Sequence, residues 1–233
     1  MRALAIVHQP DAGPGVFAEA LGAKGVELDR WPIADAPAPA EPSSYDAVLV
    51  FGGAMHADQE ADHPWLEQEK AILADLIERR VPLLGMCLGS QLVVEAAGAE
   101  PRRAPEPEIG WHEVELTPDA AADPLLGGLP SRFRAFQWHS YEAPLPPGAT
   151  ALARSPVCLQ AFRLEGPAWG VQFHAEVSRE DADYWISDYR SDPDAVRIGL
   201  DPEALRAETH AAIGAWNDFG RAMCERWVDA IRA

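Results

Sequence analysis

The sequence predicts an α/β protein with a parallel central sheet, and three of its features lead to this prediction. Short apolar segments alternate with amphipathic ones through the N-terminal half, which is typical of βαβ units. The segment Tyr45–Phe51 is almost entirely apolar, as a strand buried on both faces must be. Another apolar run ends at Gly85 and passes at once into a helix-like segment, so a strand and a helix meet at a sharp turn.

The elements of the N-terminal half follow from local patterns. Apolar residues recur every three or four positions within Asp62–Arg80, which predicts an amphipathic helix. The other segments are short and apolar, or bounded by glycine and proline, so their ends are set by turn residues. The expected strands are Ala3–Val7, Val26–Trp31, Tyr45–Phe51 and Pro82–Met86, and the expected helices are Gly15–Gly22, Asp62–Arg80 and Leu88–Ala97.

The C-terminal half is richer in sheet and ends in helices. The expected strands are Trp111–Leu116, Phe133–Trp138, Ala149–Ala153, Cys158–Leu164 and Ala168–Phe173, followed by a helix over Arg179–Tyr189. A long helix is predicted from Pro202 to about Ile231, with Asp201 as its N-cap and proline in its first position. We expect one domain over residues 1–190 and a helical extension, residues 191–233. The apolar stripe of the extension packs on its own domain or joins two copies in a homodimer.

Composition excludes several classes of function. The chain has 233 residues and a net charge of −18, which argues against binding to nucleic acid or an anionic membrane. Its three cysteines form neither a disulfide framework nor a zinc-binding pattern, so no metal and no cofactor are predicted. No apolar run approaches the roughly 18 to 20 residues that span a bilayer. The N-terminus has too short an apolar run for a signal peptide, and a reduced, cytoplasmic location is expected.

The segment Gly85-Met86-Cys87-Leu88-Gly89 has the pattern of a nucleophile on a strand-to-helix turn. Such a turn needs small residues two positions before and after the nucleophile, because the backbone is crowded there. The helix N-terminus beneath Cys87 stabilises a thiolate, and the N–H of Leu88 points toward a developing oxyanion. The alternative is a buried cysteine packed beside two glycines.

A partner for this cysteine lies in Gly170–Glu176, an apolar run that ends in His174-Ala175-Glu176. In an extended segment, residues two positions apart point to the same side, so Glu176 can lie beside His174. The carboxylate would then fix the histidine tautomer and support an imidazolium. Such a pair alone is more typical of a protein surface, but together with Cys87 it predicts a Cys-His-Glu triad.

A second oxyanion donor is expected in Gly52-Gly53, directly after the central strand. Without side chains, these residues let a backbone N–H approach a substrate closely. The alternative for this pair is a tight turn that requires a positive φ.

The segments GMCLGSQL, FGG and QFHAE, in this order, resemble the class I glutamine amidotransferase family. The resemblance covers roughly residues 1–190 and implies a flavodoxin-like, three-layer α/β/α sandwich with a mostly parallel sheet. The segments EIGW, FQWHSYEAPLP and LQAF resemble the stand-alone, GMP synthase-like members. Two departures are Ala175, where proline is frequent, and Leu88, where the GMP synthases usually have tyrosine; the second weakens an assignment to GMP synthesis.

By this resemblance, Cys87 is the nucleophile, His174 the base and acid, and Glu176 the residue that orients it. The implied oxyanion donors are the N–H groups of Gly53 and Leu88. The implied substrate contacts are Gly52, Gln91, His139, Ser140 and Tyr141.

Three functions remain open on these residues. The first is a glutaminase that forms a γ-glutamyl thioester and passes ammonia to an unidentified acceptor or a separate synthetase subunit. The second is a γ-glutamyl peptide or amine hydrolase with the same triad. The third is a non-catalytic regulatory protein that has kept the fold. The chain contains no P-loop pattern, so an ATP-dependent acceptor reaction is not expected within it.

Overall fold

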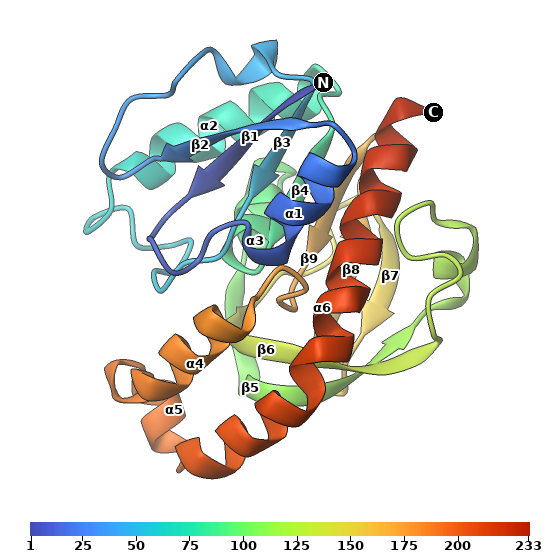
Figure 1. The fold of residues 1–233 in the computed structure, drawn as a ribbon. Helices are drawn as coiled ribbons and strands as arrows, with labels where there is room; N and C mark the ends of the chain where they lie inside the picture. The colour runs from blue at the N-terminus through green and yellow to red at the C-terminus, as the bar shows by residue number, and fades with distance from the viewer.

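A nine-stranded sheet runs through the computed structural model, which describes residues 1–233 (Figure 1). The strands are β1 (Arg2–Val7), β2 (Glu27–Pro32), β3 (Ala47–Val50), β4 (Leu83–Met86), β5 (Arg102–Leu116), β6 (Arg132–Glu142), β7 (Thr150–Arg154), β8 (Leu159–Arg163) and β9 (Ala168–Val171). Their order in the sheet is β2-β1-β3-β4-β9-β8-β7-β5-β6. The pairs from β2 to β9 are parallel, and those from β9 to β6 are antiparallel.

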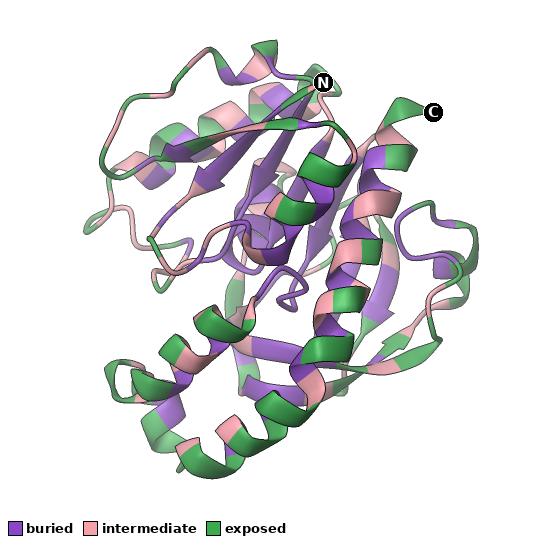
Figure 2. Cartoon of the chain, viewed as in Figure 1, coloured by how far each residue is buried: buried purple, intermediate pink, exposed green.

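Helices cover both faces of the parallel half and complete the three layers. They are α1 (Gly15–Ala23), α2 (Trp65–Glu78), α3 (Leu88–Ala96), α4 (Arg179–Ser187), α5 (Pro193–Arg197) and α6 (Pro202–Arg232), with short 3-10 turns at Pro42–Ser44, Pro118–Ala122 and Tyr189–Ser191. Alternate residues of β1 enter different cores: Ala3 packs in the cluster that contains α1 and α6 residues, and Leu4 in the cluster that contains α2 and α3 residues. The central strands β1, β3, β4 and β9 are therefore buried on both faces (Figure 2). No helix combines the length and the apolar character needed to cross a membrane.

The α/β/α fold is confirmed, and the largest difference from the sequence prediction lies in β5. This strand begins nine residues earlier than the predicted Trp111 start, at Arg102. The first half of β5 was not predicted as a strand because it contains Pro105 and Pro107, and proline has no N–H to donate to a neighbouring strand. The pairing with β6 shifts register between Arg103 and Glu108, at the two prolines.

Helix α6 packs very closely on the segment that follows β9. The Asp201 side chain caps it by accepting the N–H groups of Glu203 and Ala204, each at 3.1 Å. A methyl group built on Gly220 would lie 2.0 Å from the carbonyl oxygen of Ala175. Glycine at this position therefore brings the helix backbone against the chain between His174 and Glu176.

This contact predicts opposite effects for two glycine-to-alanine changes in α6. Gly220→Ala should lower the free energy of unfolding by about 1–3 kcal/mol, because the new methyl group overlaps backbone atoms. Gly214→Ala is the matched control: a methyl group there meets nothing within 4 Å. Since alanine is favoured over glycine in a helix by about 1 kcal/mol, this control should be stabilising. Denaturant unfolding measures both, and equal effects would contradict the packing described.

Candidate active site

Cys87 lies on the turn between β4 and α3, and its backbone has the strained geometry expected of a nucleophile elbow. Its φ is 51° and its ψ is −109°, in a region that residues with side chains rarely adopt. The two flanking glycines make the turn possible. A Cβ on Gly85 would lie 2.6 Å from the carbonyl oxygen of Gly89, and one on Gly89 would lie 2.2 Å from that of Val50.

Hydrogen bonds hold this turn against both neighbouring strands. The N–H of Cys87 donates to Val171 O at 2.8 Å, and the N–H of Gly89 donates to Phe51 O at 3.1 Å. The Cys87 sulfur lies 3.8 Å from Trp138 O. Leu88 is the first residue of α3, so its N–H has no acceptor within the helix. Its side chain is buried in the core.

His174 and Glu176 follow β9 and form a buried pair beside Cys87. The His174 Nδ1 lies 2.7 Å from Glu176 Oε1, and both residues are buried. The backbone of His174 is fixed on two sides: its N–H donates to Phe136 O at 2.9 Å, and its carbonyl accepts the indole N–H of Trp216 at 2.8 Å. Packing against the antiparallel half and α6 therefore sets the position of the imidazole.

The pair keeps a proton on the imidazole at neutral pH. Burial acts to lower the pKa of His174, but the neighbouring charges of Glu176 and Cys87 outweigh burial and raise this pKa to about 10. A protonated His174 beside Cys87 can stabilise a thiolate and can later donate its proton to a leaving group.

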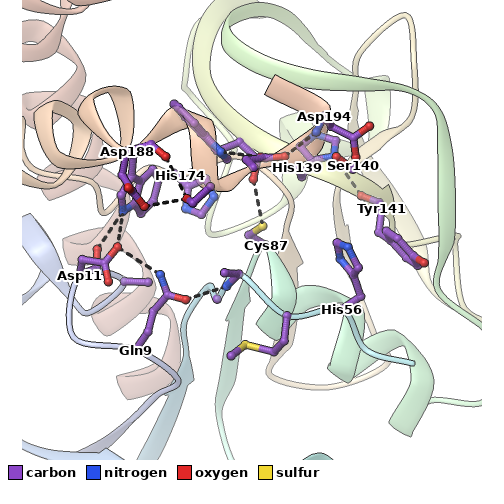
Figure 3. Close-up of a pocket in the computed structure, with 18 of the residues that line it drawn as sticks. Gln9, Asp11, His56, Cys87, His139, Ser140, Tyr141, His174, Asp188 and Asp194 are labelled. Carbon is purple, nitrogen blue, oxygen red and sulfur yellow. Dashed lines mark hydrogen bonds between the residues drawn. The ribbon is translucent and has the colours of Figure 1, made fainter. Parts of the chain in front are cut away.

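Gly52 and Gly53, after β3, lie against these side chains. A Cβ on Gly52 would lie 3.0 Å from His174 Cε1 and 3.7 Å from Cys87 Cβ. Gly53 lines a cavity of about 480 Å³ that also exposes Cys87 and His174 (Figure 3). Gly52 itself does not line this cavity. The predicted pair of glycines thus allows close backbone approach, at φ values outside the left-handed region.

The predicted substrate contacts Gln91, His139, Ser140 and Tyr141 all line the same cavity. Gln91 Nε2 donates to Tyr141 O at 3.2 Å, which links α3 to the end of β6. His139 Nδ1 also contacts Tyr141 O, at 2.9 Å, and its Nε2 lies 3.2 Å from the buried Glu108. Glu108 and His139 come from the family-like segments EIGW and FQWHSYEAPLP, so these segments support one wall of the cavity from beneath.

Sequence reasoning missed the opposite wall. Trp185 has the spacing of a core residue, but it lines the cavity and packs on His174 with ring centroids 4.8 Å apart. Its indole N–H donates to Asp11 Oδ2 at 3.0 Å, and that of Trp138 donates to Asp192 Oδ2 at 2.9 Å. Figure 3 shows Asp11 and Asp188 on the His174 side of Cys87, and Tyr141 and Asp194 on the other. No local motif marks Trp185, Asp188 or Asp192, because only the tertiary fold brings α4 and the segment before α5 over the site.

The three cysteines should differ sharply in reactivity. Burial raises the pKa of both Cys158 and Cys224, which keeps them as unreactive thiols, whereas Cys87 opens into the cavity next to a protonated histidine. Iodoacetamide at neutral pH should therefore modify Cys87 at least about tenfold faster than the other two. Peptide mass mapping over time measures the three rates. His174→Ala should slow the reaction at Cys87, and equal rates at all three cysteines would contradict the site geometry.

Comparisons with known proteins agree with this architecture. The glutamine amidotransferase class-I family model matches residues 15–188. The crystal structure of a glutamine amidotransferase from Thermotoga maritima is similar with a TM-score of 0.85 and 30% identity, covering 98% of each chain. A GMP synthase from Aeropyrum pernix is 40% identical over 131 residues, 53% of this chain and 25% of the synthase. The glutamine amidotransferase-like protein YfeJ of Salmonella typhimurium is 28% identical over 185 residues, 77% of each chain.

The matched relatives differ in length. The aligned region is about a quarter of the Aeropyrum synthase. It is 57% of a glutamine-hydrolyzing GMP synthase subunit from Thermococcus kodakarensis, which is 39% identical over 111 residues. The family model, in contrast, spans the elbow at Cys87 and the His174–Glu176 pair. This chain belongs to the class I glutamine amidotransferase family.

Proposed function

We propose that this protein hydrolyses the side-chain amide of glutamine, with Cys87 as nucleophile, His174 as general acid and base, and Glu176 as the residue that orients the imidazole. The observation that carries the proposal is the meeting of the strained Cys87 elbow and the buried His174–Glu176 pair at one cavity. Gly53 and Leu88 N–H groups are the proposed oxyanion donors. A fold kept only for regulation would not need the strained φ of Cys87.

The proposed reaction has two halves. The Cys87 thiolate attacks the amide carbon, and the resulting oxyanion accepts hydrogen bonds from the two backbone donors. The carbon–nitrogen bond breaks as His174 gives its proton to the leaving nitrogen, so ammonia departs and a γ-glutamyl thioester remains. His174 then takes a proton from water, which attacks the thioester, releases glutamate and restores the thiolate.

We infer that the ammonia passes to a separate synthetase subunit. The supporting observation is the similarity to proteins that are themselves named as subunits. One is the glutamine-hydrolyzing GMP synthase subunit of Thermococcus kodakarensis, and another is the imidazole glycerol phosphate synthase subunit HisH of a Synechococcus species. This chain carries no P-loop pattern for an acceptor reaction of its own.

The cavity lining favours a second candidate substrate, a γ-glutamyl amide whose amine carries a positive charge. At about 480 Å³ the cavity is in the range that takes drug-sized ligands. Among its aspartates, only Asp194 forms ion pairs, with Arg103 and Arg197; Asp11 and Asp188 have none. Figure 3 shows these two on the side of His174, which would protonate the leaving amine, and Asp11 accepts the indole N–H of Trp185. Aromatic rings and carboxylates without an ion-pair partner together suit an ammonium group.

Glutamate release from glutamine by the purified chain, with Cys87→Ala as the control, tests the first proposal. We expect turnover that depends on Cys87. The kcat of the variant should be lower by at least about 10³-fold, because no other group can form the thioester. Turnover that survives in Cys87→Ala would overturn the mechanism.

Comparison of two synthetic amides tests the second candidate. The γ-glutamyl amide of diaminobutane should have a kcat/KM about 5- to 30-fold above that of butylamine, which is the gain of roughly 1–2 kcal/mol expected for an ammonium on an aromatic and anionic wall. Asp188→Asn should reduce this preference. Asp183→Asn is the matched control, since Asp183 lies on α4 but pairs with His210 and does not line the cavity. Equal kcat/KM for the two amides would exclude this candidate.

A further inference from the structure

A buried histidine and glutamate lie directly behind the proposed oxyanion donor. His8 follows β1, and Glu69 belongs to α2; their side chains are fully buried. His8 Nε2 lies 3.1 Å and 3.0 Å from the two carboxylate oxygens of Glu69. His8 Nδ1 lies 2.9 Å from the carbonyl oxygen of Gly52. The histidine thus bridges a carboxylate and the backbone of the loop after β3.

The partners of His8 determine its protonation. A carbonyl oxygen only accepts hydrogen bonds, so Nδ1 must carry a hydrogen toward Gly52. On the other side, Nε2 faces both oxygens of a carboxylate, which also only accepts when ionised. Burial acts to lower the pKa of His8, but the charge of Glu69 and the hydrogen bonds outweigh burial and raise it. Nδ1 therefore donates to the Gly52 carbonyl, and a protonated His8 also donates to Glu69 through Nε2.

This donation fixes the orientation of one peptide unit. In a trans peptide the carbonyl and the following N–H point in opposite directions. The Gly52 carbonyl points at His8, so the N–H of Gly53 points away from His8, and Gly53 lines the cavity that holds Cys87. The next N–H, of Ala54, is already occupied by Gln9 Oε1 at 2.7 Å. The Gly53 N–H makes no hydrogen bond within the protein, so it is free to meet an oxyanion.

The Gly52–Gly53 peptide needs this support because a glycine backbone has few steric restraints of its own. A Gly-Gly unit has more accessible backbone conformations than any other dipeptide, including those with the peptide turned over. Neighbouring atoms crowd any stiffer residue here: a Cβ on Gly53 would lie 2.5 Å from Met55 Sδ and 3.0 Å from Leu88 Cδ2. The sequence therefore combines a flexible loop with a rigid, charged anchor beneath it.

We propose that His8 and Glu69 are positioning residues that hold the Gly52–Gly53 peptide with its N–H toward the oxyanion formed at Cys87. The proposal rests on the Cys87 amide hydrolysis proposed above. In this role the buried His8–Glu69 pair orients one backbone hydrogen-bond donor and does not contact the substrate. Loss of the anchor should reduce acyl transfer and leave the nucleophilicity of Cys87 unchanged.

Two reactions at the same sulfur separate these effects. Amide hydrolysis creates an oxyanion, whereas alkylation of Cys87 by iodoacetamide is a displacement at carbon and creates none. The test variant is His8→Leu combined with Glu69→Met, which removes both charges at similar volume, a change that buried ion pairs often tolerate. Its kcat for glutamine should fall about 10- to 100-fold, less than the roughly 10²- to 10³-fold cost of deleting a donor outright. Its KM and its alkylation rate at Cys87 should stay within about twofold of wild type.

A rescue variant and a milder variant complete the experiment. His8→Asn with Glu69→Met returns an N–H donor near the position of Nδ1 and should recover most of the kcat. Should the leucine–methionine protein fail to fold, Glu69→Gln keeps the size and one acceptor, and its kcat should fall about threefold or more at an unchanged alkylation rate.

Each outcome decides the proposal. Loss of kcat with alkylation intact, together with recovery by asparagine, supports it. An unchanged kcat, or a parallel loss of kcat and alkylation, overturns it, since the pair then has no effect on the site or only a structural one. Failure of the proposed function has a different signature: wild-type turnover is then absent or survives in Cys87→Ala.

Discussion

Parallel strands that end at one edge of the sheet are the constraint on which the rest of this structure depends. Strands β3, β4 and β9 are neighbours and run in the same direction, so the segments after them meet. These segments carry Gly53, Cys87 and His174. No single strand end could supply the proposed donor, nucleophile and base at this spacing. The register of the two ladders β3·β4 and β4·β9 sets the distances between them, which makes the geometry stiff.

Close backbone contacts hold the residues at this edge of the sheet in position. Gly89 lets α3 begin against the carbonyl of Val50, directly after Cys87. Gly220 lets α6 approach the carbonyl of Ala175, and Trp216 from the same helix bonds to His174 O. The strain at Cys87 is therefore maintained by packing on both faces of the sheet. The C-terminal helix is part of the support of His174, which its sequence did not reveal.

The sequence predicted the parts of the site that depend on local geometry. Local sequence patterns predicted the glycines around Cys87 and the two-residue spacing of His174 and Glu176. The structure places these residues together. The parallel half of the sheet was predicted for the same reason, from continuous apolar runs. The start of β5 was not, because Pro105 and Pro107 look like a loop when the pairing partner is unknown.

The remaining residues could not be found by local rules. Trp185 has helical spacing with apolar neighbours, and only the placement of α4 over the cavity turns it toward His174. His8 and Glu69 lie 61 positions apart, and neither belongs to a motif. Charged residues at the end of a strand and on an amphipathic helix ordinarily face solvent, so their pairing depends on how α2 packs beside β1 and β3.

The measurement that tests the central claim most directly is capture of the acyl-enzyme. The protein is mixed with glutamine, quenched in acid within the first turnovers, digested and examined by mass spectrometry. A γ-glutamyl thioester on the peptide that contains Cys87, lost on treatment with hydroxylamine, is the predicted result. Turnover of glutamine with no adduct on Cys87, or with the adduct on another residue, would contradict the account.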